Sequence, residues 1–241
     1  MEGPCVFLIA KRLKFLKGKT PLEVKGNTRE NKEIILGKKI IDIKSHGKYL
    51  IFEFDFFYLI IHFLMYGSIR INKIEKEKKE RLSIKFNDTF INFYNTSIRI
   101  LNKEDFIFDP STDIMKKQFD ILKTKKKIIN SKEFICDLLL DQRIFAGVGN
   151  IIKNEALFRA KVHPLSVGKK IEEEYIENLI KETISFSRLF YNIRKSKKSL
   201  KNYLLIYGKK YCKICKEKVK LKLTGKTKRK TYFCENCQVL F

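Results

Sequence analysis

Four cysteines near the end of the chain form the pattern with the most definite chemistry. They lie in two C-x2-C pairs separated by 18 residues, namely Cys212, Cys215, Cys234 and Cys237. This spacing lets two tight turns present four thiolates tetrahedrally to one ion, and Zn2+ is the ion expected there. Because four thiolates leave no open coordination position, the expected zinc is structural and performs no chemistry. Disulfides or a redox pair are the competing interpretation.

The charge of the chain indicates a polyanionic partner. Its 241 residues include 52 Lys plus Arg against 27 Asp plus Glu, which gives a formal net charge of +25 at pH 7. A metabolic enzyme with a neutral substrate has no need for this imbalance. Hydrophobic residues make up 44% of the chain, so the composition excludes a disordered basic tail and indicates a buried core.

The longest apolar stretch, residues 50–69, is expected to form two buried strands. Glu53, Asp55 and His62 interrupt it, whereas a membrane span needs about 20 mostly apolar residues. Basic residues break up the first apolar run, and no small-residue cleavage site follows, so no export signal is expected. We therefore expect an intracellular protein without membrane contact, in the cytoplasm of a prokaryote or the nucleus of a eukaryote.

The period of the apolar residues changes along the chain and predicts an α+β multidomain fold. Short alternating stretches over residues 34–101 predict an antiparallel β-sandwich or barrel, introduced by a helix over residues 5–16. Residues 109–112 mark a boundary, because a proline followed by hydroxyl side chains suits the start of a helix. Over residues 113–207 the period lengthens to three or four, which predicts a helical module.

Within the helical module, Gly147 and Gly149 bracket Val148 directly before a helical run from Asn150 to Ala160. A glycine loop that opens a helix directs backbone N–H groups and the positive end of the helix dipole at whatever lies in front of it. The loop is therefore a candidate phosphate-binding site. A tight turn between helices is the alternative, and the glycines alone do not decide between the two.

Three stretches carry a resemblance to a known family. The chain begins Met1-Glu2-Gly3-Pro4, residues 140–164 read LDQRIFAGVGNIIKNEALFRAKVHP, and residues 229–234 read RKTYFC. In order and spacing they resemble the formamidopyrimidine-DNA glycosylase/endonuclease VIII family of base-excision repair enzymes, in its endonuclease VIII-like branch. The resemblance implies three domains. These are an N-terminal catalytic β-sandwich over residues 1–110, a helix-two-turn-helix domain over residues 111–207 and a C-terminal zinc ribbon over residues 208–241.

The resemblance also implies that the leading amine is a nucleophile. In the family this amine attacks a deoxyribose C1′, the damaged base leaves, and the resulting Schiff base permits strand elimination. An α-amine has a reference pKa of about 7.7 to 8.0, so it is partly neutral near pH 7. By resemblance Met1 supplies the amine, Glu2 moves protons and Lys48 contacts a phosphate beside the lesion. Family members expose Pro or Val instead, and a primary-amine imine must gain a proton, so slower elimination than in a proline enzyme is expected.

Three further residues are DNA-binding candidates by resemblance. Asn150 and Arg229 would contact phosphates that flank the extruded nucleotide, and Met65 would fill the vacated base stack. A helix N-cap, a solvated hairpin charge and a buried core methionine are the respective alternatives. A second wedge of the family, an Arg-Arg-Phe-Gly turn, would align near residues 95–100, which read NTSIRI. Its absence predicts weak discrimination of the opposite base and activity on single-stranded DNA.

The sequence thus predicts a monomeric DNA glycosylase with abasic-site lyase activity that binds damaged DNA, including single-stranded DNA. By resemblance its substrates are oxidised pyrimidines, hydantoins and formamidopyrimidines, and 8-oxoguanine is disfavoured. One alternative is a damaged-DNA-binding protein of the same fold with impaired catalysis. The other is an RNA-binding zinc-ribbon protein, which charge alone would favour.

Overall fold

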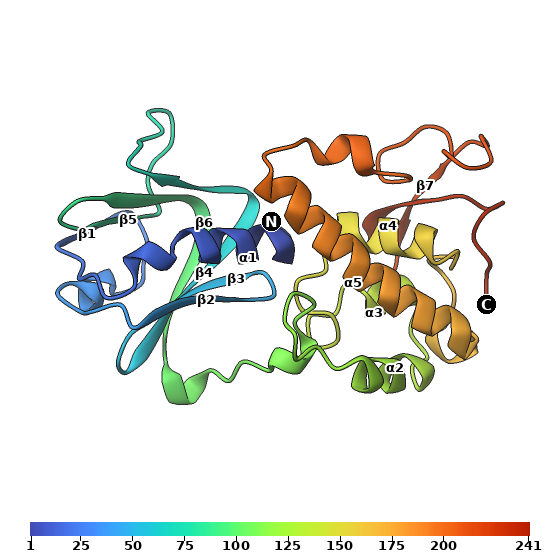
Figure 1. Cartoon of the computed structure of the whole chain (residues 1–241), viewed down its shortest axis with the longest axis horizontal. Coiled ribbons are helices and arrows are strands. Elements are labelled where there is room, and N and C mark those ends of the chain that lie inside the picture. The colour runs from blue at the N-terminus through green and yellow to red at the C-terminus, as the bar shows by residue number, and fades with distance from the viewer. The chain divides into compact units, whose positions relative to one another are not determined.

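The computed structural model describes all residues, 1–241, as two compact units (Figure 1). Unit 1 consists of Met1 and Cys5–Phe108, and unit 2 consists of Glu2–Pro4 and Asp109–Phe241. The main part of the second unit therefore begins at the position where the sequence changes its apolar period. It holds the helical module and the cysteine-rich segment together, and the division of the chain into three domains stays a prediction.

Unit 1 is built on a six-stranded antiparallel sheet. Its strands are β1 (Glu23–Lys25), β2 (Asp42–His46), β3 (Tyr49–Glu53), β4 (Phe57–Ile71), β5 (Leu82–Lys85) and β6 (Phe90–Asn102). They lie in the order β1-β5-β6-β4-β3-β2, and each neighbouring pair is antiparallel. The pairing of the two long strands β4 and β6 shifts register between Phe63 and Ser68. The antiparallel fold predicted for this segment is confirmed.

One face of this sheet packs into a core, because side chains alternate between the two faces of a strand. Leu59, Ile61 and Phe63 of β4 belong to the buried cluster, together with residues of helix α1 (Gly3–Arg12). The helix predicted over residues 5–16 begins earlier, at Gly3, and its last part is a separate 3-10 turn at Lys14–Leu16. The opposite face of the sheet carries Tyr49, His62 and Arg99, which are more exposed.

Unit 2 combines four α-helices with a two-stranded hairpin. The elements are α2 (Ile121–Ile129), α3 (Ile135–Leu138), α4 (Asn150–Arg159), α5 (Glu173–Lys195), β7 (Lys220–Thr224) and β8 (Arg229–Phe233). Asp120 caps α2, since its carboxylate accepts a hydrogen bond from the Lys123 N–H at 2.8 Å. The buried helix α4 packs against the long helix α5 on one side and against β8 on another (Figure 1).

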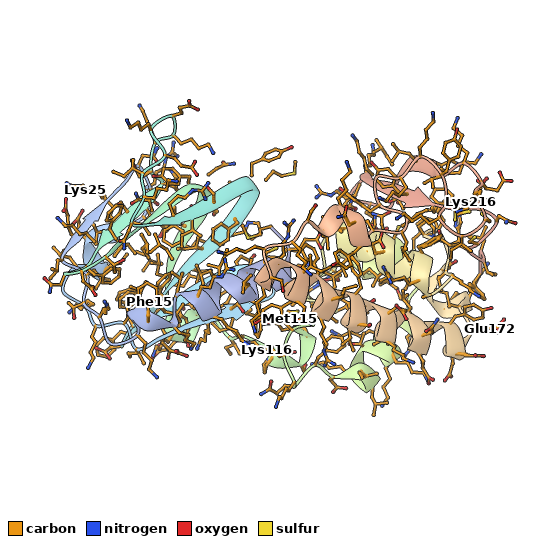
Figure 2. All side chains as sticks on the ribbon, turned by 45° about the horizontal axis from the view of Figure 1, so that its top comes forward. Phe15, Lys25, Met115, Lys116, Glu172 and Lys216 are labelled. Atoms are coloured by element: carbon orange, nitrogen blue, oxygen red, sulfur yellow. The ribbon has the colours of Figure 1, made fainter.

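Two properties of the surface bear on the partner of the chain. Lysine side chains project from both units, for example Lys25 at the end of β1 and Lys216 in the cysteine-rich segment, and both are exposed (Figure 2). This distribution agrees with the net charge of +25. No helix combines the length and the apolar character that a bilayer-spanning segment requires.

Candidate functional site

Glu2 lies at the N-terminal end of helix α4. Its carboxylate accepts three backbone hydrogen bonds, from Ile151 N at 2.7 Å and from Gly149 N and Ile152 N at 3.2 Å each. Unpaired N–H groups and the positive end of the dipole make the start of a helix a binding site for anions. Here the anion is a side chain of the same chain, so the helix fixes the orientation of the Glu2 carboxylate.

The two glycines of the loop before α4 make this contact possible. A Cβ on Gly149 would lie 2.4 Å from Cδ of Glu2, and a Cβ on Gly3 would lie 2.7 Å from Cα of Gly147. The Gly3 N–H also donates to the Gly147 carbonyl at 2.8 Å. The sequence suggested that this loop binds phosphate. In the structure its helix-end amides bind the Glu2 carboxylate instead.

The Met1 amine lies in unit 1, next to the point in β4 where its pairing with β6 shifts register. The Met1 nitrogen donates to the Phe63 carbonyl at 3.0 Å. Lys48, half-buried in the turn between β2 and β3, lies near His62 of β4. Burial lowers the pKa of His62, and the positive charges of the leading amine and Lys48 lower it further. The structure therefore brings the two predicted nitrogens, those of Met1 and Lys48, to the same histidine.

His62 is a site residue that sequence reasoning missed. In the sequence it only interrupts the apolar stretch 50–69, whereas in the structure it is half-buried next to two cationic groups. The signal in the sequence was its alternation with the core residues of β4, which places it on the opposite face of the sheet from Ile61 and Phe63. Alternation gives the face of a residue but not its neighbours on other strands.

Met65 lies in β4, at the point where the pairing of this strand with β6 shifts register. Its side chain is 63% exposed, so the alternative of a buried core methionine is wrong. The Asn95 side chain supports it from β6, where Nδ2 donates to the Met65 carbonyl at 2.5 Å. Residues 95–100 run within β6 and form no projecting turn. The absence of a second wedge stays a prediction.

Asn150 and Arg229 both lie where helix α4 meets the hairpin. Asn150 Nδ2 donates to the Lys230 carbonyl at 2.8 Å, and Gly149 occupies the N-cap position, so the alternative of an Asn150 cap is wrong. Arg229 begins β8 and is exposed. The two predicted DNA-binding residues are therefore close together in unit 2, because Asn150 bonds to the residue after Arg229.

Three consecutive polar residues of α4 are fully buried, and each forms hydrogen bonds to another segment of unit 2. Lys153 Nζ donates to Thr231 Oγ1 at 2.7 Å. The Asn154 Oδ1 accepts the Tyr232 N–H at 2.6 Å. The Glu155 carboxylate accepts the N–H groups of three successive residues at 2.9 to 3.0 Å, namely Leu205, Ile206 and Tyr207. Helix α4 therefore holds both strand β8 and the segment that precedes the cysteines.

Lys153 is the most unusual member of this row, since a buried lysine is rare without a charged partner. Burial lowers its pKa to about 8, and the nearby Arg229 guanidinium acts in the same direction. Cys136, Asp137 and Glu2 oppose this effect. Sequence reasoning missed Lys153, because a lysine in a chain this basic gives no sign of being buried.

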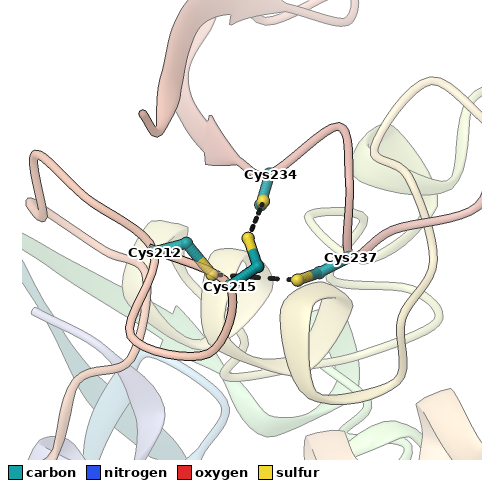
Figure 3. A group of neighbouring side chains, drawn as sticks. All are labelled: Cys212, Cys215, Cys234 and Cys237. Carbon is teal, nitrogen blue, oxygen red and sulfur yellow. Dashed lines mark hydrogen bonds between the residues drawn. The ribbon is translucent and has the colours of Figure 1, made fainter. Parts of the chain in front are cut away.

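The four cysteines lie at one end of the hairpin, with their side chains turned toward one another (Figure 3). Their sulfur atoms all lie within 4.8 Å of one another. Cys212 Sγ is 3.8 Å from Cys237 Sγ, and Cys215 Sγ is 3.4 Å from Cys234 Sγ. Tetrahedral coordination with metal–sulfur bonds of about 2.3 Å requires sulfur separations of about 3.8 Å. The cluster therefore fits one metal ion.

Comparisons with known proteins match both units. The family model described as the formamidopyrimidine-DNA glycosylase N-terminal domain matches residues 7–99. The model described as the formamidopyrimidine-DNA glycosylase H2TH domain matches residues 111–189. Together they span the sheet of unit 1 and most of the helices of unit 2.

Individual relatives agree with these matches. Endonuclease 8-like 3 of Xenopus laevis is 32% identical over 217 residues, which cover 85% of this chain and 35% of the frog protein, so the chain spans about a third of that relative. Formamidopyrimidine-DNA glycosylase of Rickettsia bellii is 28% identical over 265 residues, covering 99% of this chain and 94% of the relative. The crystal structure of Lactococcus lactis formamidopyrimidine-DNA glycosylase, bound non-covalently to DNA with an AP site, superposes with a TM-score of 0.87 at 27% identity and covers 99% of both chains. Since the domain matches, the relatives and the fold agree, the chain belongs to the formamidopyrimidine-DNA glycosylase/endonuclease VIII family.

Proposed function

We propose that this chain is a DNA glycosylase of base-excision repair with abasic-site lyase activity, and that Met1 and Glu2 carry its chemistry. The observation that supports this most directly is the position of Glu2. Its carboxylate is held by three amides at the start of α4, and the next residue toward the N-terminus carries the amine. A fixed acid adjacent to a primary amine is the pair of groups that Schiff-base chemistry on a sugar needs.

The proposed reaction proceeds in two stages. The amine lone pair attacks the deoxyribose C1′, the bond between C1′ and the base breaks, and the base leaves with that electron pair and gains a proton. Glu2 protonates the opening sugar ring, which yields a Schiff base between the Met1 nitrogen and C1′. Loss of the C2′ proton then expels the 3′ phosphate and nicks the strand. Water releases the sugar fragment and restores the amine.

The remaining residues would bind DNA rather than react with it. Lys48, beside His62 and the amine, is suited to a phosphate near the lesion. Arg229 is exposed next to the Asn150–Lys230 contact, where a planar guanidinium can clamp two phosphate oxygens. Met65 is exposed at the tip of a supported bulge, and is suited to fill the space that an extruded base leaves.

The proposed metal is Zn2+, which would be held by the four cysteine thiolates. Zinc supplies no reaction step in a closed site of this kind and stabilises a hairpin too small to fold by itself. Of the lesions that family members remove, oxidised pyrimidines, hydantoins and formamidopyrimidines are the proposed substrates. The proposed partner is damaged DNA bound by a monomer, and the lack of a second wedge favours single-stranded substrates.

Borohydride trapping on DNA with an abasic site tests the proposal. Reduction of the Schiff base should join the protein to DNA, and mass spectrometry should locate the adduct on the nitrogen of the first residue. A form with one extra residue before Met1 should bind the same DNA and give no adduct at that position. Tight binding without any adduct from the unextended chain would instead support the damaged-DNA-binding alternative, and equal affinity for RNA would support the ribbon alternative.

Glu2→Gln is the matched variant for the acid. It keeps the size of the side chain and one of the two oxygens that accept from α4, but it cannot deliver a proton. Removal of a damaged base should fall by about 100-fold to 10,000-fold, the usual contribution of general acid–base catalysis, while DNA affinity should change little. Unchanged single-turnover base removal would exclude Glu2 as the acid.

A further inference from the structure

A hollow on the outer face of the unit 1 sheet shares His62 with the site described above, but its other lining residues have no role in the proposed chemistry. It has a volume of about 260 Å³, and its lining comes from β3, β4, β6 and the segment after β6. Pockets for drug-sized ligands have volumes of about 300 to 1,000 Å³, so this one suits a smaller group such as a single nucleobase. The face is opposite to the one that packs into the core.

The strand register explains which side chains meet there. Tyr49 pairs with His62, and His62 pairs with Ser97, so these three side chains form one row across three strands. Arg99 pairs with Ile60 in the next row. Directly opposed residues of antiparallel strands lie on the same face, within about 5.5 Å of each other. The sheet therefore places aromatic, polar and cationic groups side by side.

Aromatic rings line the hollow. The Tyr49 and His62 ring centroids lie 5.3 Å apart, and Phe106 lines the same hollow from the segment after β6. Phe106 is itself positioned by Phe108, with ring centroids 4.4 Å apart. Tyr49 is 38% exposed, so its ring is accessible from solvent. Rings positioned in this way can receive a planar group by stacking.

The charge around the hollow favours an anionic ligand. Arg99 is exposed at its edge, and His62 lies near Lys48 and the leading amine. No carboxylate lines the hollow. Glu53 lies in the row of the sheet that includes the lining residue Leu101, and its carboxylate already pairs with Lys44 at 2.8 Å and with Lys103 at 2.9 Å. A planar group that carries a negative charge is therefore the ligand that this surface fits.

We propose that this hollow binds one unpaired nucleotide of single-stranded DNA, with the base stacked on Tyr49 and Phe106 and the phosphate beside Arg99. The inference deepens the proposed function in taking DNA as the partner, but it requires no catalysis. A paired base inside a duplex is covered on both faces by its neighbours, so it cannot stack on these rings. The hollow therefore provides selectivity for single strands.

Fluorescence anisotropy with undamaged oligonucleotides tests the inference independently of base removal. Tyr49→Ala and Phe106→Ala should each weaken binding of a labelled single strand by about 5-fold to 150-fold, which corresponds to the 1 to 3 kcal/mol of one base stack. Binding of the duplex of the same sequence should change by less than about 2-fold. Tyr49→Phe, which keeps the ring, should bind single strands like the unmodified chain.

Phe56→Ala is the control, because Phe56 is an 83% exposed aromatic in the turn between β3 and β4 and lies outside the hollow. It should leave both affinities unchanged. Photocrosslinking of a single strand that contains 5-iododeoxyuridine gives a second readout without any substitution, and the crosslinked peptides should contain Tyr49 or Phe106. Equal weakening of single-strand and duplex binding, or crosslinks at neither residue, would overturn the inference. Failure of borohydride trapping alone would leave it intact.

Discussion

Replacement of the buried Lys153 by methionine should change how the stability of the protein depends on pH. The ordinary pKa of a lysine is 10.5, and burial lowers that of Lys153 to about 8. Below pH 8 the folded and unfolded chains both carry the proton, so the folded chain bears the full cost of burying a charge. Between pH 8 and 10.5 the folded chain releases the proton while the unfolded chain keeps it, so stability rises with pH. At 1.36 kcal/mol per pH unit, this interval amounts to about 3 kcal/mol.

Urea unfolding at pH 7 and pH 10 measures this effect. Lys153→Met removes the titrating group, so its free energy of unfolding relative to the unmodified chain should fall by about 2 to 3 kcal/mol between these two pH values. Groups distant from Lys153 titrate equally in both proteins and cancel in the difference, whereas Cys136, whose pKa the Lys153 charge lowers, adds a contribution of its own. Lys126→Met, at an exposed position of α2, is the matched control and should give a difference that is independent of pH. If the difference in unfolding free energy for Lys153→Met were also independent of pH, it would refute the conclusion that Lys153 is a buried lysine with a lowered pKa.

The remaining predictions concern the supports of the site. Gly149→Ala should reduce single-turnover base removal by about 100-fold or more, because its Cβ would lie 2.4 Å from Cδ of Glu2 and displace the acid. A metal content equal to that of the unmodified chain would show that the variant keeps its fold. Glu155→Gln should lower the free energy of urea unfolding by about 2 to 3 kcal/mol, since a charged acceptor of three buried amides is lost. Asn95→Gly, which keeps the positive φ of 49° accessible but removes the support of Met65, should weaken binding to duplex abasic DNA by about 2-fold to 10-fold. Chelation of the metal should weaken DNA binding, because Arg229 lies on the hairpin beside the cysteines, while the far-UV circular dichroism of the helices persists. Full retention of affinity after verified metal loss would contradict the role given to the cysteine site.

Local patterns predicted the elements of this fold but not the contacts between distant residues. Alternating and helical periods predicted the strands, the helices and the boundary near residue 109, and cysteine spacing predicted the cysteine cluster, because each depends on neighbours in sequence. The contact of Glu2 with helix α4 joins residues separated by 147 to 150 positions. The loop before α4 therefore read as a possible phosphate site, since nothing nearby revealed that its amides were already bound.

The burial of polar side chains was equally hidden from sequence reasoning. Lys153 and Glu155 have the composition of a solvated helix surface, and only the packing of α4 inside unit 2 shows that both are fully buried. The surroundings of His62 were missed for a related reason, because its cationic neighbours, Lys48 and the leading amine, come from a turn and from the start of the chain. The motif that contains α4 was identified by resemblance, but the contacts of its individual polar residues are visible only in the structure.

Glu155 fixes the main chain of residues 205–207 independently of their side chains. The carboxylate recognises only main-chain amides, which every amino acid except proline supplies. Other contacts constrain the side chains, since Leu205 packs against the buried cluster around Ile206 and the Tyr207 ring lies 5.1 Å from that of Tyr232. The path of this segment is therefore determined twice, by its amides at Glu155 and by its side chains against the hairpin.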